Sequence, residues 1–308
     1  MPARLERRSA RILALILAFI MLGSVFAYMS GGGKNEKREI KLYLQDFRDW
    51  IKIAPEGGGF FYYNITELSI LSKKLGNNDP LVNLTQNELY TVLRSPYLDR
   101  RVIELTHGVE ELMLAEYSHY PVYFINDNAS RVYFAKESDY KVGNLTVQFS
   151  RYGIAMVSET SPLIVGYAPI VLEIAKYAEK GIESNYSNYI NRVNDTFVFA
   201  FITFGNESGK YLQTGETNQS FVGIVDFLFQ GFRYNFTSNQ YEKVLGIHFT
   251  ENYFFYHLNE TEKDFEYYYF DNFGDGFSLA VMGDKDFTKT LKARPNILGL
   301  IIKEVNES

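Results

Sequence analysis

Residues 253–282 read YFFYHLNETEKDFEYYYFDNFGDGFSLAVM, in which short aromatic and aliphatic runs are separated by polar and glycine-containing segments. Phe and Tyr favour extended backbone, and short runs of them between turn-forming residues are typical of strands. We therefore expect strands at 253–258, 265–270 and 277–282. The whole chain shares this composition, with 25 Phe and 24 Tyr among 308 residues, which favours a β-rich domain over a helical bundle.

The same pattern continues toward the N-terminus of this half. Strands are expected at 196–204, 244–249 and 297–302, whereas 221–232 fits either a helix or a strand. Residues 182–308 are therefore expected to form a β-rich second half of the molecule.

Residues 40–181 combine helical and strand-like patterns, so the predicted fold class is α+β. Apolar periodicity, a Thr85-x-x-Glu88 capping box and a stop at Gly181 predict helices at 40–51, 66–75, 86–94, 98–117 and 169–180. Strands are expected at 60–63, 122–125, 131–135, 145–149 and 154–157. The order of elements resembles that of the second half, with Val122 matching Ile247 and Gly153 matching Gly276, so a further hypothesis is that the domain consists of two similar α+β halves.

Charge and cysteine content exclude several classes of function. The net charge is −6, and the first eleven residues carry +3, which leaves −9 on the remainder. An acidic body without a Lys/Arg-rich stretch argues against nucleic-acid binding. The absence of cysteine excludes disulfides and thiolate metal sites, and a cysteine-free ectodomain is typical of a prokaryotic, archaeal-type cell surface.

Residues 12–30, ILALILAFIMLGSVFAYMS, carry no charge and are long enough to cross a bilayer as a helix. Arginines precede this segment, so the positive-inside rule predicts a single-pass signal-anchor with residues 1–11 as a cytoplasmic basic tail. Residues 31–39 would form a stalk, and residues 40–308 an extracellular domain on the cell membrane. Two alternatives are a cleaved signal peptide and a pilin-like segment that assembles into a filament.

N-glycosylation sequons are the most specific motif in the chain. Random placement of 22 Asn and 34 Ser plus Thr predicts about 2.4 sequons in 308 residues, and the sequence has eleven, all after the apolar segment. Two independent patterns thus agree on an external location, with N-linked glycans as partners, although Asn-rich turns also generate sequons. The candidate sites are Asn64, Asn83, Asn128, Asn144, Asn185, Asn194, Asn206, Asn218, Asn235, Asn259 and Asn306.

Two weak metal candidates stand out. Glu104, His107 and Glu111 would share one face of the expected 98–117 helix, and Asp271 and Asp275 lie in an oxygen-rich turn of the kind that binds Ca²⁺. Solvated surface charge and a plain Asx/Gly turn are the competing interpretations. No cofactor is expected otherwise, and no motif identifies a catalytic residue.

These patterns predict a membrane-anchored, heavily N-glycosylated extracellular protein that acts without catalysis, as a binding, envelope or membrane-complex component. It would contact the lipid bilayer through residues 12–30 and a protein partner through its surface. The alternative functions are a membrane-tethered extracellular hydrolase and a pilin-like filament subunit.

Overall fold

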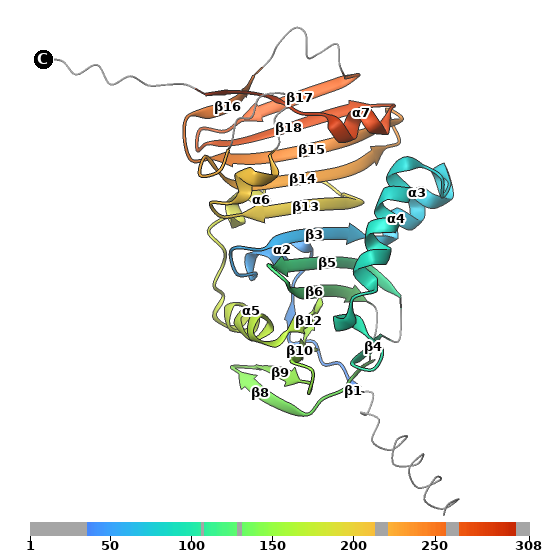
Figure 1. Cartoon of the computed structure of the whole chain (residues 1–308), viewed down its shortest axis with the longest axis vertical. Helices are drawn as coiled ribbons and strands as arrows, with labels where there is room; N and C mark the ends of the chain where they lie inside the picture. The colour runs from blue at the N-terminus through green and yellow to red at the C-terminus, as the bar shows by residue number, and fades with distance from the viewer. Residues whose placement is uncertain (1–35, 106–107, 128–130, 213–220, 257–264, 300–308) are drawn as a thin grey trace, which may run out of the picture.

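The computed structural model describes residues 36–105, 108–127, 131–212, 221–256 and 265–299. It is a mixed α+β structure, rich in strands, with one large antiparallel sheet and few helices (Figure 1). Among the described residues, no helix is long and apolar enough to cross a membrane. The expected membrane segment, residues 12–30, lies outside the described residues.

Twelve strands form the large sheet, and their spatial order is β17-β18-β15-β14-β13-β3-β5-β6-β12-β10-β9-β8. In chain order they are β3 (Gly59–Asn64), β5 (Val109–Tyr117), β6 (Tyr120–Asp127), β8 (Ser138–Val142), β9 (Leu145–Phe149), β10 (Ile154–Val157), β12 (Leu163–Tyr167), β13 (Phe199–Phe204), β14 (Val225–Asn235), β15 (Gln240–Phe249), β17 (Tyr267–Asn272) and β18 (Phe277–Asp284).

Smaller strands and helices complete the fold. A three-stranded sheet has the order β1-β7-β4, and two further pairs are β11-β2 and β16-β19. Their bounds are β1 (Glu36–Lys37), β2 (Leu42–Tyr43), β4 (Ile103–Leu105), β7 (Arg131–Phe134), β11 (Thr160–Ser161), β16 (Tyr253–Tyr256) and β19 (Asn296–Gly299). The helices are α2 (Phe47–Lys52), α3 (Ile65–Leu75), α4 (Pro80–Leu93), α5 (Ala168–Lys180), α6 (Ser187–Ile190) and α7 (Phe287–Lys292), with 3₁₀ turns η1 (Pro96–Leu98) and η2 (Ser208–Tyr211).

The strands β3 and β13 pair at the middle of the large sheet, with Phe61 opposite Phe201. Because successive side chains of a strand point to opposite faces, the run from Phe60 to Tyr63 supplies aromatic rings to both sides. On one face Tyr62 contacts Phe47 of α2 at a ring-centroid distance of 4.5 Å, within a core shared with α5 and α6. On the other face Tyr63 packs in a core with α3 and α4.

Strands extend outward from both members of this central pair, six beyond β3 and four beyond β13. Outward from β3 come β5, β6, β12, β10, β9 and β8, and outward from β13 come β14, β15, β18 and β17. A short helix precedes each central strand, α2 before β3 and α6 before β13, and these two helices contact each other.

Several local expectations are confirmed. The helix expected at 66–75 is α3, whose first turn is capped by the Asn64 side chain accepting from the Glu67 N–H at 2.8 Å. The helix expected at 169–180 is α5, and it ends at Gly181, whose φ of 61° is left-handed. Glycine reaches this conformation without the steric penalty of a Cβ.

The expected helix at 98–117 is wrong. This segment contains the end of η1, then β4 and β5, and β5 pairs with β3 on one side and β6 on the other. Its ELMLAEY run lacks clear alternation because adjacent residues such as Leu112 and Met113 are both fully buried, on opposite faces. A strand covered on both faces cannot be distinguished from a buried helix by periodicity alone.

Two expected helix starts also differ. Thr85 is not an N-cap: it lies inside α4, fully buried, and its hydroxyl donates to the Leu81 carbonyl at 2.9 Å. The helix is capped by Asp79, one residue before Pro80. The helix expected at 40–51 is reduced to α2, because residues 42–43 pair with β11 instead.

The end of the expected 31–39 stalk belongs to the folded body. Strand β1 pairs with β7, and the Arg38 side chain, 3% exposed, forms an ion pair at 2.5 Å with Asp127, whose side chain is 0% exposed. Arg38 also donates to the carbonyls of Ser158 at 3.1 Å and Thr160 at 2.8 Å. The chain is thus fixed to the body from its first described residues onward.

Candidate functional site

Seven of the eleven sequon asparagines lie in the described residues, and five of these are exposed: Asn83, Asn144, Asn185, Asn194 and Asn206. Asn64 and Asn235 are half-buried. The Asn235 amide nitrogen, the atom that a glycan would modify, donates at 2.8 Å to Glu242, which is 4% exposed. Asn128, Asn218, Asn259 and Asn306 lie outside the described residues.

The first metal candidate does not share a helix face. Glu104 belongs to β4 and Glu111 to β5, while His107 lies outside the described residues. Glu111 accepts hydrogen bonds from the Tyr62 hydroxyl at 2.5 Å and from Asn126 at 2.8 Å. Among the described residues, no cluster of three His, Cys, Asp or Glu could hold a metal ion.

The second metal candidate is divided between a strand and a turn. Asp271 is exposed on β17, whereas both carboxylate oxygens of Asp275 accept from the Arg192 guanidinium, at 2.8 and 2.6 Å. The hydrogen bonds from Arg192 lower the pKa of Asp275 to about 2. A cation at Asp275 would have to displace Arg192, so the geometry is that of an ion pair.

His248 forms a structural cross-link next to this ion pair. Its Nδ1 lies 2.5 Å from Asp226 and its Nε2 lies 3.0 Å from the Asp275 carbonyl oxygen, and the ring stacks on Tyr189 at 4.2 Å. Burial lowers the pKa of His248, but the hydrogen bond and charge of Asp226 outweigh burial, and the net pKa is raised. Both ring nitrogens of His248 therefore take part in contacts within the protein.

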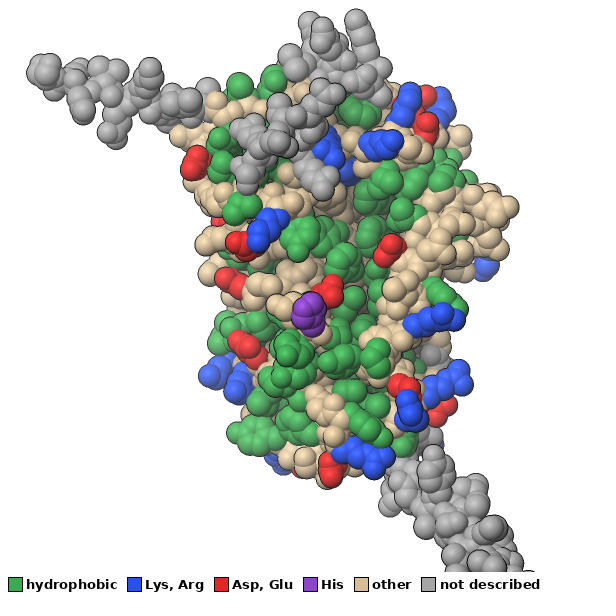
Figure 2. Space-filling view, in the orientation of Figure 1, with side chains coloured by type: hydrophobic (Ala, Val, Ile, Leu, Met, Phe, Trp, Pro, Cys, Tyr) green, Lys and Arg blue, Asp and Glu red, His purple; other side chains and the backbone are tan. Residues whose placement is uncertain are grey.

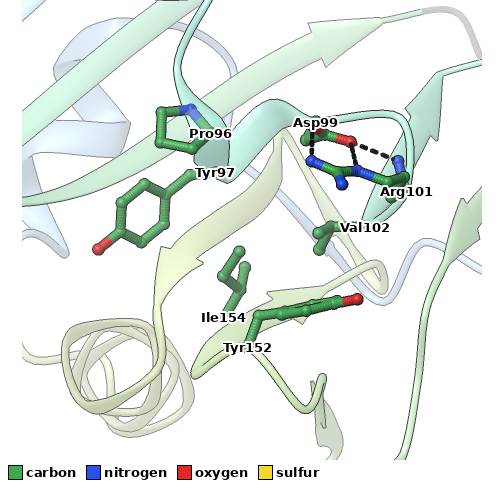
Figure 3. A pocket seen from close by; sticks show the side chains of 7 residues that line it. All are labelled: Pro96, Tyr97, Asp99, Arg101, Val102, Tyr152 and Ile154. Atoms are coloured by element: carbon green, nitrogen blue, oxygen red, sulfur yellow. Dashed lines mark hydrogen bonds and ion pairs between the residues drawn. The ribbon is translucent and has the colours of Figure 1, made fainter.

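A concave site is formed where α4 ends and the chain turns through η1 into β4. Here a cavity of about 280 Å³ has an apolar floor that includes Val102 and Ile154, and tyrosine walls from Tyr97 and Tyr152 (Figure 3). The chain turns at this point because Ser95 caps η1 and Pro96 follows it, an arrangement that ends α4. Tyr152 reaches the cavity from the turn between β9 and β10.

A second cavity, of about 350 Å³, lies on the same segment. Its lining includes Leu98, Arg100, Ile103 and Glu104 from that segment, together with Leu112 of β5. We call residues 93–105 with Tyr152 and Ile154 the η1–β4 site. None of the residues that line its two cavities is a sequon asparagine.

Arginines surround the η1–β4 site. Asp99 accepts from the Arg101 side chain at two positions, both at 2.9 Å, and these hydrogen bonds lower the pKa of Asp99 to about 2. Arg151 donates to the Tyr152 hydroxyl at 2.8 Å and lies over its ring. Within the described residues, neither Arg100 nor Arg151 forms an ion pair with a carboxylate.

A third cavity, of about 310 Å³, lies at the ends of β3, β5 and β13. Its walls include Phe61, Phe201 and Tyr211, and its rim includes Glu116 and the sequon residue Asn206. A glycan on Asn206 would cover this opening. The η1–β4 site has no such obstacle on its lining, and it is the better candidate for contact with another molecule.

The sequence contained a partial signal for the η1–β4 site. Ser95-Pro96 marks a turn and Arg100-Arg101 is an Arg-Arg pair, but the expected 98–117 helix placed the two arginines inside a helix. Tyr152 and Ile154 lie about fifty residues further along the chain, and only the folded sheet brings them to the segment.

Comparisons with known proteins place the chain in a family. The model of the AF_2048_N family N-terminal domain matches residues 43–176. An uncharacterized protein of Archaeoglobus fulgidus is 43% identical over 307 residues, covering 97% of this chain and 96% of that protein. The chain belongs to the AF_2048_N family.

In this member of the AF_2048_N family, both cavities of the η1–β4 site lie wholly within the matched range. Among solved structures, crystal form IV of TP0453 gives a TM-score of 0.36 at 8% identity, covering 79% of this chain and 96% of that chain. Crystal form III gives a TM-score of 0.35, also at 8% identity, covering 76% of this chain and 92% of that chain. These TM-scores are too low to indicate a shared fold.

Proposed function

We propose that this member of the AF_2048_N family is a single-pass membrane-anchored, N-glycosylated protein whose extracellular domain binds another molecule without catalysing a reaction. The anchor is the uncharged segment 12–30 behind four arginines. The sequon excess after that segment supports an external location, and five sequon asparagines have exposed side chains to which a glycan could be attached.

The observation that carries the binding role is the η1–β4 site, which has one mainly apolar cavity and one of mixed lining; concave sites with an apolar lining and a few polar groups are the usual form of a ligand site. Each cavity has a single carboxylate in its lining, Asp99 in one and Glu104 in the other. Asp99 is held by Arg101. A hydrolase that uses paired acids needs two carboxylates facing one bond, so the lining favours binding over hydrolysis.

The repeated element order supports a second part of the proposal, that the domain consists of two similar α+β halves, 40–181 and 182–308. Val122 of β6 and Ile247 of β15 lie on strands at equivalent positions, each the third strand outward counting from β3 or β13. Gly153 and Gly276 do not, because Gly153 precedes the fifth strand and Gly276 the fourth. The two halves therefore correspond better by the position of their strands in the sheet than by the residue pairs that the sequence pattern matched.

The test is intact-mass and glycopeptide mass spectrometry on the membrane fraction of a glycosylating host that expresses the full chain. We expect retention of residues 1–30 and glycans on the exposed asparagines. Bare sequons would contradict the external location. Loss of the N-terminal segment would contradict the anchor and favour secretion or filament assembly.

A further inference from the structure

The η1–β4 site lies beside the point where the chain enters the folded body. β4 is separated from β1 by one strand, β7, and neighbouring strands are roughly 4.8 Å apart. Leu105, the last residue of β4, and Glu36 of β1 pair with the same residue of β7, Val132, so they are about 10 Å apart. In Figure 1 both strands lie at the β8–β9 end of the large sheet.

The proposed anchor restricts how far this end can move from the bilayer. Five residues, 31–35, separate the end of the apolar segment from β1, and a fully extended chain spans at most about 3.5 Å per residue. Ser30 and Glu36 are six residue steps apart, so the first described strand lies within roughly 21 Å of the end of the membrane segment. The Arg38 ion pair with buried Asp127 prevents the next residues from lengthening this tether.

The surface of this end has the composition of a membrane interface. Tyr152 is 52% exposed at the cavity mouth, and Tyr97 forms the opposite wall. Tyrosine and arginine are the side chains that combine an apolar body with a polar tip, and they are favoured at the headgroup level of a bilayer. Figure 2 shows hydrophobic side chains gathered on the lower part of this face, with Lys and Arg side chains around them.

The charge of this surface is opposite to that of the chain. Within the η1–β4 site, Arg94, Arg100 and Arg101 outnumber Asp99 and Glu104 by one, and the neighbouring Arg151 brings the net charge to +2, in a chain of −6. A basic patch on an acidic body is electrostatically complementary to an anionic surface.

We propose that the η1–β4 site docks onto the anionic lipid headgroups of the bilayer that carries the chain, with its arginines on phosphates and its tyrosine-walled cavity open to the upper part of a lipid chain. This inference rests on the proposed membrane anchor and adds to it a fixed orientation of the domain. An acidic protein partner is the competing occupant. The tether favours the lipid, because the bilayer surface is always within reach.

The absence of cysteine allows a direct test with the full chain. Tyr152→Cys at the site and Tyr267→Cys on the distal edge strand β17 are matched, since Tyr152 and Tyr267 are 52% and 45% exposed. Each variant is labelled with bimane and reconstituted into nanodiscs of phosphatidylglycerol and phosphatidylcholine that contain a headgroup-proximal doxyl lipid quencher. We expect at least twofold stronger quenching at position 152 than at position 267.

The contribution of charge is tested in the Tyr152→Cys background. Arg100→Gln with Arg151→Gln should reduce the quenching at least twofold, and phosphatidylcholine discs should have the same effect. Lys73→Gln with Lys292→Gln removes the same charge from exposed positions on α3 and α7 and should change nothing.

Equal quenching at the two labels, in a chain that remains with the discs in 1 M salt, would overturn the docking while leaving the anchor intact. Quenching that is insensitive to the arginine substitutions would overturn the headgroup contact. A chain that does not remain with the discs would contradict the anchor itself, which separates failure of the proposed function from failure of this inference. Protection of label 152 only when an acidic protein is added would favour the protein partner.

Discussion

The Arg38–Asp127 ion pair is expected to be the most sensitive polar contact of the described structure. We consider Arg38→Met, which keeps much of the side-chain volume and removes the guanidinium. The native guanidinium bonds to the Asp127 carboxylate and to two backbone carbonyls, in a setting where both side chains are at most 3% exposed. The variant removes the Arg38 cation from the buried Asp127 carboxylate.

The expected cost follows from this burial. Removing one partner of a buried ion pair destabilises a protein by about 3–5 kcal/mol, because the remaining charge cannot be hydrated. Replacing both partners by apolar groups is often close to neutral, so Arg38→Met with Asp127→Leu should recover most of the loss. The difference between the double variant and the sum of the single variants gives the coupling energy.

Urea unfolding of the full chain in detergent measures these values. Trp50, the single tryptophan, is fully buried and stacks on Phe124 at 6.3 Å, so its fluorescence reports directly on the core. Arg101→Met provides a matched control, because the Arg101 side chain is 82% exposed in its ion pair with Asp99. Solvent screens such a pair, and the control should leave the midpoint nearly unchanged.

The reasoning is refuted if Arg38→Met shifts the free energy of unfolding by no more than Arg101→Met does. It is also refuted if the double variant is as unstable as Arg38→Met alone, because the cost would then come from lost packing and not from the stranded charge. Either result would mean that the entry of the chain is held by the β1–β7 pairing and not by this ion pair.

Three further predictions concern single groups. Burial, together with the charge of Arg294, lowers the pKa of Lys243 to about 8. The free energy of unfolding of the native chain, relative to that of Lys243→Met, should therefore rise by up to about 3 kcal/mol between pH 8 and 10.5 in urea unfolding. A difference between the two chains that does not change with pH would contradict this. The pKa of His248 is raised by Asp226, so the ion pair stabilises the folded state below about pH 6.5, and this stabilisation is lost as pH rises through the folded pKa of His248. His248→Gln should therefore lower the melting temperature more at pH 6 than at pH 8.5. Glycopeptide mass spectrometry should find lower occupancy at Asn235, whose amide is engaged by buried Glu242, than at an exposed site, and equal occupancy would refute this.

Much of the strand content was predictable, because aromatic runs between turn residues depend on local sequence. The run from Phe60 to Tyr63 and the segments of the second half became strands, and Gly181 ended its helix as expected. The 98–117 segment failed for a physical reason: Leu112 and Met113 are buried on opposite faces, and the β3 and β6 partners that cover β5 were not visible in its own sequence.

The candidate site was less predictable than the fold. Its cavity needs Tyr97 and Val102 from one segment and Tyr152 and Ile154 from another, and no short motif records that these will meet. The metal candidates that the sequence suggested also depend on distant parts of the fold. Glu104 and Glu111 lie on different strands, and Arg192 forms an ion pair with Asp275.

The tertiary contact of Arg38 with Asp127 changes what the stalk residues imply about the orientation of the domain. Gly31–Gly33 and the charged residues after them suggest a solvated, flexible connection, and such a tether would leave the orientation of the domain free. The partner of Arg38 is Asp127, 89 positions away, so a local reading of the sequence cannot detect the contact. With Arg38 buried, only a few residues lie between the body and the proposed anchor. In the anchored chain that we propose, the tether keeps the surface next to β1 nearest to the bilayer, and the arginines and tyrosines of the η1–β4 site are found beside that surface.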